Sequence, residues 1–234
     1  DKTVIKIDKK APKVDTIKSE LVSKTEASVT ISIIEKGSGM KAYYISTDET
    51  EPTENDWVEH NTNVIDFTKL NEGTIYYLWL KDNAGNILER QEIQVASVNY
   101  VVDNNFYVET LQTAISKAND GSTIELVKNY TDESDATINK NITLNINEYT
   151  LTRTKTITIN SNKTVEITGA GKITSGSNNI NTITNNGILT ISDKIVIENN
   201  STSYGYYTIY NYSNNSNLNI VDSVNILGNY KGIS

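Results

Sequence analysis

The side chains best suited to binding a ligand are five tyrosines in the segment NNSTSYGYYTIYNYSNNSN at 199–217. They are Tyr204, Tyr206, Tyr207, Tyr210 and Tyr212. A tyrosine ring offers a flat apolar face and a hydroxyl, which suits sugars and protein surfaces, and the surrounding Ser, Gly and Asn add adaptable hydrogen bonds. If the chain itself binds a ligand, the sequence therefore predicts that it does so here. The alternative is an Asn-rich loop whose tyrosines pack on the wall of the domain.

Acidic residues are densest at 132–135, where the sequence reads DESD. Asp132, Glu133 and Asp135 fall between two strand-like segments, so we expect them in a solvated turn. A cation site is the alternative, since carboxylate oxygens are the ligands that calcium prefers.

Metal-binding patterns are weak elsewhere. The segment DNAGN at 82–86 is rich in oxygen ligands, but its spacing departs from the EF-hand calcium loop and no Glu closes it. We expect a turn between two strands, where Asn, Asp and Gly supply left-handed conformations. His60 has no partner His or Cys, and the chain contains no cysteine at all. The sequence predicts no metal site, no disulfide and no cofactor.

The charge balance is acidic throughout. The formal net charge is −8, and residues 1–98 contribute −5 of it, from 17 acidic and 12 basic residues. A chain without a basic excess does not attract a phosphate backbone, so we expect no nucleic-acid partner. No apolar run approaches the roughly 18 residues that cross a bilayer, so we expect no membrane insertion.

A short motif returns at intervals through the second half of the chain. It reads TINKN at 137–141, TINSN at 158–162, TITNN at 182–186 and TIYNY at 208–212, with spacings of 21, 24 and 26 residues. A period of about 20 to 30 residues, built of short strands without intervening helices, is typical of a β-solenoid. In such a fold each repeat buries its apolar face on the next.

Each repeat is interpreted as three short parallel strands with inward apolar residues. On the first strand these are Ile138, Ile159, Ile183 and Ile209; on the second Leu144 with Ile146, Val165 with Ile167, Leu189 with Ile191 and Leu218 with Ile220; on the third Leu151, Ile173, Ile197 and Ile226. Asn141, Asn162 and Asn186 hold equivalent places between the first two strands. Asn tolerates the left-handed conformation, and its amides can stack at the strand spacing of about 4.8 Å. We therefore expect a ladder of hydrogen bonds from coil to coil.

The outward positions of the coils are mostly Thr, Asn and Ser. Only Glu166, Lys172 and Glu198 are ionisable there, and we expect them not to stack. Cleavage of a polysaccharide needs two or three ionisable groups within a few ångströms, such as paired carboxylates. We therefore predict no catalytic residues and no enzyme activity.

One helix is expected before the repeats. Its apolar residues recur at i, i+3, i+4 and i+7, after Thr110 as N-cap and before Asn119-Asp120-Gly121. They are Leu111, Ala114, Ile115 and Ala118. Because a solenoid exposes its core at its end, we predict that this helix caps it, above a first strand at 123–127. The apolar segment 97–108 should run as a strand or packed connector.

The first hundred residues alternate short β-rich runs with turn residues. Six or seven such strands in about 95 residues are typical of an antiparallel sandwich. In TIYYLWLKD at 74–82, either Ile75, Tyr77 and Trp79 or the alternate set with Leu78 and Leu80 faces inward. We expect the set with Trp79, the largest apolar side chain.

This first part resembles the bacterial immunoglobulin-like modules found as tandem spacers in surface proteins. The resemblance lies in GSGMKAYYIST at 37–47, in EPT at 51–53 followed by Trp57, and in GTIYYLWLKDNAGNI at 73–87. It implies a rigid spacer or presenter, sometimes an interaction module. The disulfide of antibody domains is absent, so the sandwich alone carries over.

The second part resembles the parallel β-helix, or pectin-lyase-like, regions of bacterial surface proteins. The resemblance lies in TLQTAISKANDGSTIELVKN at 110–129 and ATINKNITLNINEYTLT at 136–152. It implies a right-handed coil, as parallel crossovers generally are. It does not imply one activity, because this scaffold hosts lyases, hydrolases and non-catalytic adhesins.

Together these patterns predict an all-β chain with an immunoglobulin-like sandwich at 1–98 and the capped start of a parallel β-helix at 99–234. We expect a non-catalytic, monomeric fragment of a bacterial protein that is extracellular, secreted or attached to the cell wall. Its β-helix would present a binding surface to a glycan or to a host or cell-surface protein. The alternative is the N-terminal part of a polysaccharide lyase or glycoside hydrolase whose active site lies outside this fragment.

Overall fold

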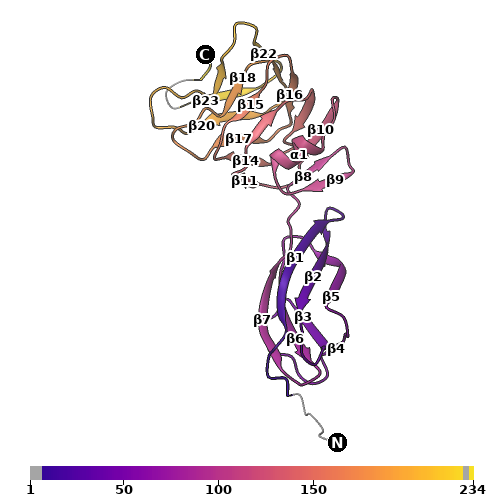
Figure 1. Ribbon diagram of the computed structural model, residues 1–234. Coiled ribbons are helices and arrows are strands. Elements are labelled where there is room, and N and C mark those ends of the chain that lie inside the picture. The colour runs from indigo at the N-terminus through magenta and orange to yellow at the C-terminus, as the bar shows by residue number, and fades with distance from the viewer. Residues whose placement is uncertain (1–6, 229–231) are drawn as a thin grey trace, which may run out of the picture. The chain divides into compact units, whose positions relative to one another are not determined.

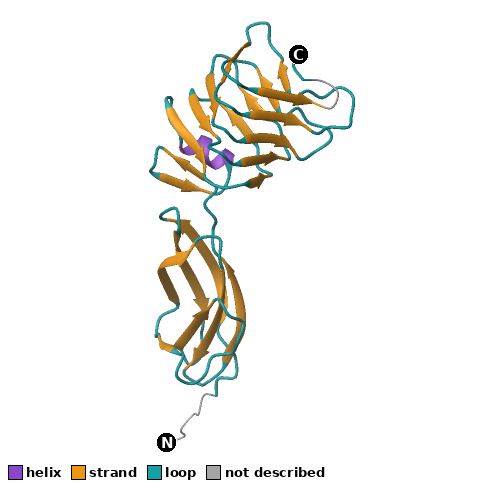
Figure 2. Ribbon diagram, turned by 180° about the vertical axis from the view of Figure 1, so that it is seen from behind, coloured by secondary structure: helices purple, strands orange, loops and turns teal. Residues whose placement is uncertain are grey.

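The computed structural model describes residues 7–228 and 232–234, which form many strands and one short helix (Figures 1 and 2). The chain divides into two compact units, Asp1–Ser97 and Val98–Ser234, each with its own hydrophobic core. Antiparallel sheets form the first unit, and a parallel β-solenoid of about four turns forms most of the second. This much of the predicted fold is confirmed. Over the described ranges, no helix is long and apolar enough to cross a membrane.

The first unit contains two sheets that share one core. In spatial order, one sheet holds β1 (Lys13–Leu21), β2 (Glu26–Ile34) and β5 (Val64–Asn71), and the other holds β4 (Val58–Glu59), β3 (Met40–Ser46), β6 (Ile75–Asp82) and β7 (Ile87–Gln94). Strand β2 shows the cause of the packing. Its apolar residues alternate with polar ones, so Ala27, Val29, Ile31 and Ile33 are buried on one face.

The predicted inward face of β6 is wrong. Leu78 and Leu80 belong to the core, whereas Ile75 is exposed and Tyr77 is only partly buried. Trp79 is buried too, but outside the core between the two sheets. Alternation allowed either face, and the aliphatic residues on the partner strands decided which one was covered.

Three sheets run along the solenoid, and we name them by length. The long sheet holds, in spatial order, β22 (Asn217–Ile220), β19 (Ile188–Ile191), β16 (Thr164–Thr168), β13 (Ile142–Asn145), β10 (Ser122–Leu126), β8 (Tyr100–Val102) and β9 (Phe106–Val108). The middle sheet holds β11 (Tyr130–Asp132), β14 (Thr150–Arg153), β17 (Lys172–Ser175), β20 (Val196–Asn199) and β23 (Asn225–Gly228). The short sheet holds β12 (Ala136–Ile138), β15 (Ile157–Ile159), β18 (Ile183–Asn185) and β21 (Ile209–Asn211).

The connector predicted as strand is an antiparallel hairpin. Strands β8 and β9 pair with each other, and β8 pairs antiparallel with β10, the first strand of the parallel stack. The long sheet therefore continues past the first turn of the solenoid.

Inward residues stack in columns as predicted, but some strands pair two residues away from the predicted register. In the middle sheet Leu151 and Ile173 are partners. In the short sheet, however, Ile157 rather than Ile159 is the partner of Ile183, two residues from the predicted match. The strands of the long sheet shift equally between β13 and β16. A shift of two residues keeps every side chain on its face, because the strand period is two, so the predicted core survives.

The last turn is incompletely covered. Leu218 is partly buried and Ile220 is 44% exposed, although both were expected inward. Their strand, β22, pairs with β19 on one side only within the described residues. Burial of an inward residue requires a covering neighbour, which the repeat pattern does not supply.

The predicted stacking of Asn amides is wrong, although two of the three asparagines form hydrogen bonds from coil to coil. Asn162 adopts a left-handed backbone (φ 61), but it is exposed and its side chain makes no hydrogen bond within the described part of the chain. The Asn141 Oδ1 atom accepts from the Thr164 N–H at 2.8 Å, and the Asn186 Nδ2 atom donates to the Ile159 carbonyl at 3.0 Å. These amides therefore bind neighbouring backbone and do not stack on one another.

The predicted helix is confirmed as α1 (Leu111–Lys117). The Thr110 side chain is its N-cap and accepts from the Thr113 N–H at 3.2 Å. Leu111, Ala114 and Ile115 are buried in the core of the solenoid. Figure 2 shows the helix at one end of the stack, beside the β8–β9 hairpin.

Candidate functional site

Three of the five predicted tyrosines form one aromatic group on the short sheet. Tyr210 lies in the middle of β21, and its ring stacks on that of Tyr207, with centroids 5.1 Å apart and planes 17° from parallel. The Tyr212 ring meets Tyr210 edge-on at 5.8 Å. We call Tyr207, Tyr210 and Tyr212 the tyrosine group. Such aromatic pairs stabilise one another beyond their burial, which holds the rings in place.

The other two predicted tyrosines lie on the loop before β21. Tyr204 is 81% exposed, and Tyr206 is partly buried with no ring contact within the described residues. Tyr212 is 69% exposed, whereas Tyr207 and Tyr210 are partly buried. The five tyrosines thus differ in exposure, with Tyr204 and Tyr212 facing solvent and the other three partly buried.

Two loops tied to each other position Tyr207. The Tyr207 N–H donates to the Asn181 side chain at 2.8 Å, from the loop after β17. The buried Asn199 amide donates to the carbonyls of Tyr207 at 2.7 Å and Ile180 at 2.9 Å. The Ser201 N–H in turn donates to the Asn199 side chain at 2.7 Å. The buried Asn199 side chain thus both donates and accepts hydrogen bonds, and such buried amides resist displacement. They fix the start of the loop that leads to Tyr207.

A buried amide supports the sheet beneath the rings. Asn185 is fully buried, and its Nδ2 atom donates to the Asn211 side chain at 2.9 Å and to the Asn217 carbonyl at 3.0 Å. Its Oδ1 atom accepts from the Gly187 N–H at 3.0 Å. Asn185 and Asn211 are register partners in β18 and β21. The coil-to-coil amide contact expected of other asparagines is thus formed here, under the tyrosine group.

One ion pair lies on the outer face of the middle sheet. Lys172 contacts Glu198 through their charged ends, and the Thr174 hydroxyl donates to the same carboxylate at 3.1 Å. The expectation that these ionisable residues do not stack is therefore wrong for this pair. The Lys172 ammonium is the main cause that holds the pKa of Glu198 below its ordinary value. This pair supplies one carboxylate and one lysine, whereas acid–base cleavage of a glycan uses two carboxyl groups.

Three carboxylates meet in the first unit. Ligand oxygens of Asp8, Glu35 and Asp82 lie within 4.8 Å of one another, an arrangement that could hold a metal ion. Sequence reasoning singled out only Asp82, as part of a turn, because the other two lie far away in the chain. A cavity of about 900 Å³, with Ile34, Ile87 and other residues in its wall, opens beside Asp8 and Glu35.

Each of these carboxylates already accepts hydrogen bonds from the protein. Asp8 accepts from the N–H groups of Lys10 at 3.0 Å and Ser38 at 2.8 Å, which hold its pKa below the ordinary value. The two oxygens of buried Asp82 accept from the Asn86 N–H at 2.8 Å and from its side-chain amide at 2.7 Å. These bonds tie segments of the first unit together and make the cluster a structural junction of loops.

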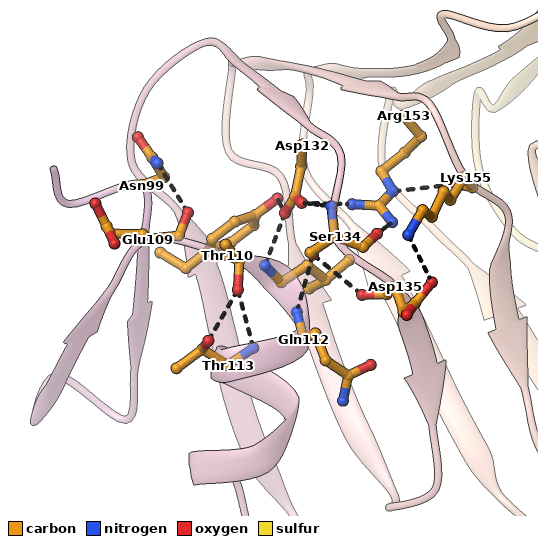
Figure 3. A network of polar contacts seen from close by, with 12 residues as sticks. Asn99, Glu109, Thr110, Gln112, Thr113, Asp132, Ser134, Asp135, Arg153 and Lys155 are labelled. Carbon is orange, nitrogen blue, oxygen red and sulfur yellow. Dashed lines mark hydrogen bonds and ion pairs between the residues drawn. The ribbon is translucent and has the colours of Figure 1, made fainter. Parts of the chain in front are cut away.

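The acidic segment 132–135 is not a solvated turn throughout. Glu133 and Asp135 are exposed as expected, but Asp132 is fully buried at the end of β11 (Figure 3). Its carboxylate accepts from the Leu111 N–H at 2.7 Å and from the hydroxyl of buried Tyr100 at 2.9 Å. Burial raises the pKa of Tyr100, so its hydroxyl stays protonated as a donor. The segment is therefore a structural anchor for α1.

Comparison of the chain with protein-family models, with curated proteins and with solved structures finds no match in any of the three.

Proposed function

We propose that this chain is a non-catalytic binding module of a bacterial extracellular protein, secreted or attached to the cell wall. In this proposal the first unit is an immunoglobulin-like spacer. The second is a right-handed parallel β-helix that presents a ligand-binding surface. The tyrosine group carries the proposal, because it holds three aromatic rings together, one of them largely exposed, in a segment rich in Asn and Ser.

Helix α1 is proposed as the cap of the solenoid. Its buried side is continuous with the core, and both of its ends are bound by side chains of the first turn. At its C-terminus the Lys140 ammonium donates to the carbonyls of Ile115 and Ser116, each at 3.0 Å. Capping elements keep solenoids soluble, which suits a module exposed outside the cell.

The proposed ligand is a glycan. Sugar rings present apolar faces to aromatic side chains and hydroxyls to Asn and Ser. Tyr210 contacts two other tyrosine rings and lies in a segment rich in Asn and Ser. We expect binding to be weak and weakly dependent on salt, because the tyrosine loop carries no charge to be screened.

A glycan array read with the wild type and with Tyr206→Ala, Tyr207→Ala and Tyr210→Ala variants tests the proposal. We expect the Tyr207 and Tyr210 substitutions to abolish the signal, and Phe106→Ala, which removes a part-exposed ring at the other end of the solenoid, to leave it intact. Signal that survives every tyrosine change would place binding elsewhere. Release of reducing or unsaturated sugar from a polysaccharide would favour the enzyme instead.

A further inference from the structure

We propose that the outer face of the short sheet binds one uncharged polysaccharide chain that lies along the solenoid axis, from Tyr210 to Thr137. This inference rests on the proposed glycan binding and specifies its chemistry and direction. The track that it names consists of the outward residues of four consecutive strands.

The register of the short sheet aligns these residues in one column. Thr137 of β12 is the partner of Thr158 in β15, which is the partner of Thr184 in β18, which is the partner of Tyr210 in β21. Thr137, Thr158 and Thr184 each lie between two buried residues of their strands, and Tyr210 follows buried Ile209 in the same register. All four therefore point away from the core. Three strand spacings of about 4.8 Å separate the ends, which makes the column about 14 Å long. A polymer bound along it would meet a hydroxyl at every turn.

Both ends of the column are built from residues that are held in place. At one end Tyr210 is packed between Tyr207 and Tyr212. At the other end the Gln112 side chain of α1 accepts from the Thr137 N–H at 3.2 Å. The aromatic ring at one end can stack on a sugar. The hydroxyls and the amide along the rest of the column can form hydrogen bonds with the sugars that follow it, so the column suits a chain of sugars.

Two lysines near the column, Lys140 and Lys155, are already bound to other groups of the protein, which favours an uncharged ligand. The Lys140 ammonium is bound to the carbonyls at the end of α1, and Lys155 forms an ion pair with Asp135 at 3.0 Å. Strands β12, β15, β18 and β21 contain no Lys or Arg. The column therefore offers no positive charge to a uronate or a sulfate. Chains with many carboxylates would also be repelled by a protein of net charge −8.

The other two faces of the solenoid carry charged outward residues. On the long sheet, Glu166 interrupts the outward column between Thr143 and Thr190. On the middle sheet, the outward face carries the ion pair of Lys172 and Glu198. Among the described strands, the short sheet therefore has the outward column without a charge, and this column leads to the tyrosine group.

Titration of the intact chain with neutral oligosaccharides of increasing length, taken from a polysaccharide that the array identifies, tests the track. We expect affinity to rise with length, since longer chains reach Thr158 and Thr137. Thr158→Val and Thr137→Val, which remove a hydroxyl and keep the shape, should weaken binding of the longest chains about three- to tenfold, the usual effect of one hydrogen bond. They should leave binding of disaccharides unchanged. Thr143→Val on the long sheet is the matched control and should change neither.

The outcomes separate the track from the proposed function. If the tyrosine variants abolish binding while the threonine variants bind every length like the wild type, the track is refuted and the glycan-binding function stands. If neither set changes binding, both are refuted. Tighter binding of uronate chains than of neutral ones would refute the assigned ligand class. Tyrosine-dependent capture of a protein, with no binding of free oligosaccharides, would show that the partner is a protein.

Discussion

The Asp132 Oδ1 atom lies 3.0 Å from the Arg153 Nη1 atom, and both side chains are fully buried. The two residues are register partners in β11 and β14, so the ion pair joins two consecutive turns of the solenoid. Arg153 also donates to the carbonyl of Ser134 at 2.5 Å (Figure 3). The same carboxylate accepts from the first N–H of α1, which is favourable because the helix N-terminus attracts negative charge.

Removal of one partner of this pair is expected to destabilise the solenoid severely. Arg153→Met leaves the Asp132 charge buried without compensation, which typically costs about 3 to 5 kcal/mol of unfolding free energy. Lys155→Met is the matched control, since it breaks an ion pair between the same two turns whose side chains are 52% and 75% exposed. Such exposed pairs contribute about 1 kcal/mol or less.

Urea unfolding followed by circular dichroism measures both variants. Both tryptophans, Trp57 and Trp79, lie in the first unit, so their fluorescence monitors that unit separately. Similar losses for Arg153→Met and Lys155→Met would show that the buried pair has no special role.

Acid is expected to weaken the solenoid through Asp132. Burial by itself would raise its pKa, but hydrogen bonds from Ser134 and from the Leu111 N–H, with the charge of Arg153, hold the pKa below the ordinary 3.8. A folded-state pKa below the unfolded one stabilises the protein above the unfolded pKa. That contribution is lost as pH falls through the folded pKa, that is, below about pH 4.

A comparison of variants isolates this contribution. Unfolding free energies measured from neutral pH to pH 2 should fall less steeply below pH 4 in Asp132→Asn than in the wild type. Glu198→Gln removes another carboxyl group with a lowered pKa, but a partly exposed one, and should flatten the curve less. An unchanged slope in Asp132→Asn would contradict the assignment.

Lys140 is expected to stabilise the C-terminal end of α1. Its ammonium contacts the carbonyls of Ile115, Ser116 and Ala118, where the helix end carries partial negative charge. Lys140→Met should lower the unfolding free energy by about 1 kcal/mol and speed hydrogen exchange at the α1 amides. Lys163→Met, at the corresponding turn of the next coil, should leave exchange in α1 unchanged.

Asn162 is expected to matter through its backbone alone. At φ 61, a leucine pays about 1 to 2 kcal/mol for the left-handed conformation, whereas glycine adopts it without strain. Asn162→Leu should therefore lower the melting temperature, while Asn162→Gly should lower it little. Equal losses for the two would indicate that the amide side chain forms contacts after all.

Local patterns in the sequence were enough for the solenoid and its core. The returning Thr, Ile and Asn motif fixed the number of coils, and alternation fixed which residues point inward, since the period of a strand is two. The α1 helix followed from Thr110 and the apolar spacing after it. Even where the predicted partner of Ile183 was wrong by two residues, its face was right.

Composition and local chemistry also located the tyrosines, but not their grouping. Tyr207, Tyr210 and Tyr212 are joined because strand β21 projects alternate residues outward and because Asn181 and Asn199 hold the preceding loop. Those two asparagines belong to earlier segments of the chain. A local pattern does not state which of many asparagines makes such a contact.

The sequence by itself thus determined the repeat, the inward faces of the solenoid strands, the helix and the segment rich in tyrosine. Only the tertiary structure decided that Asp132 is buried against Arg153, that Asp8, Glu35 and Asp82 converge, and that the column from Thr137 reaches Tyr210. The physical reason is the distance along the chain between the residues that interact. Periodicity and capping act between residues a few positions apart, whereas pairing of charges and alignment of columns depend on strand register between residues some twenty or more positions apart.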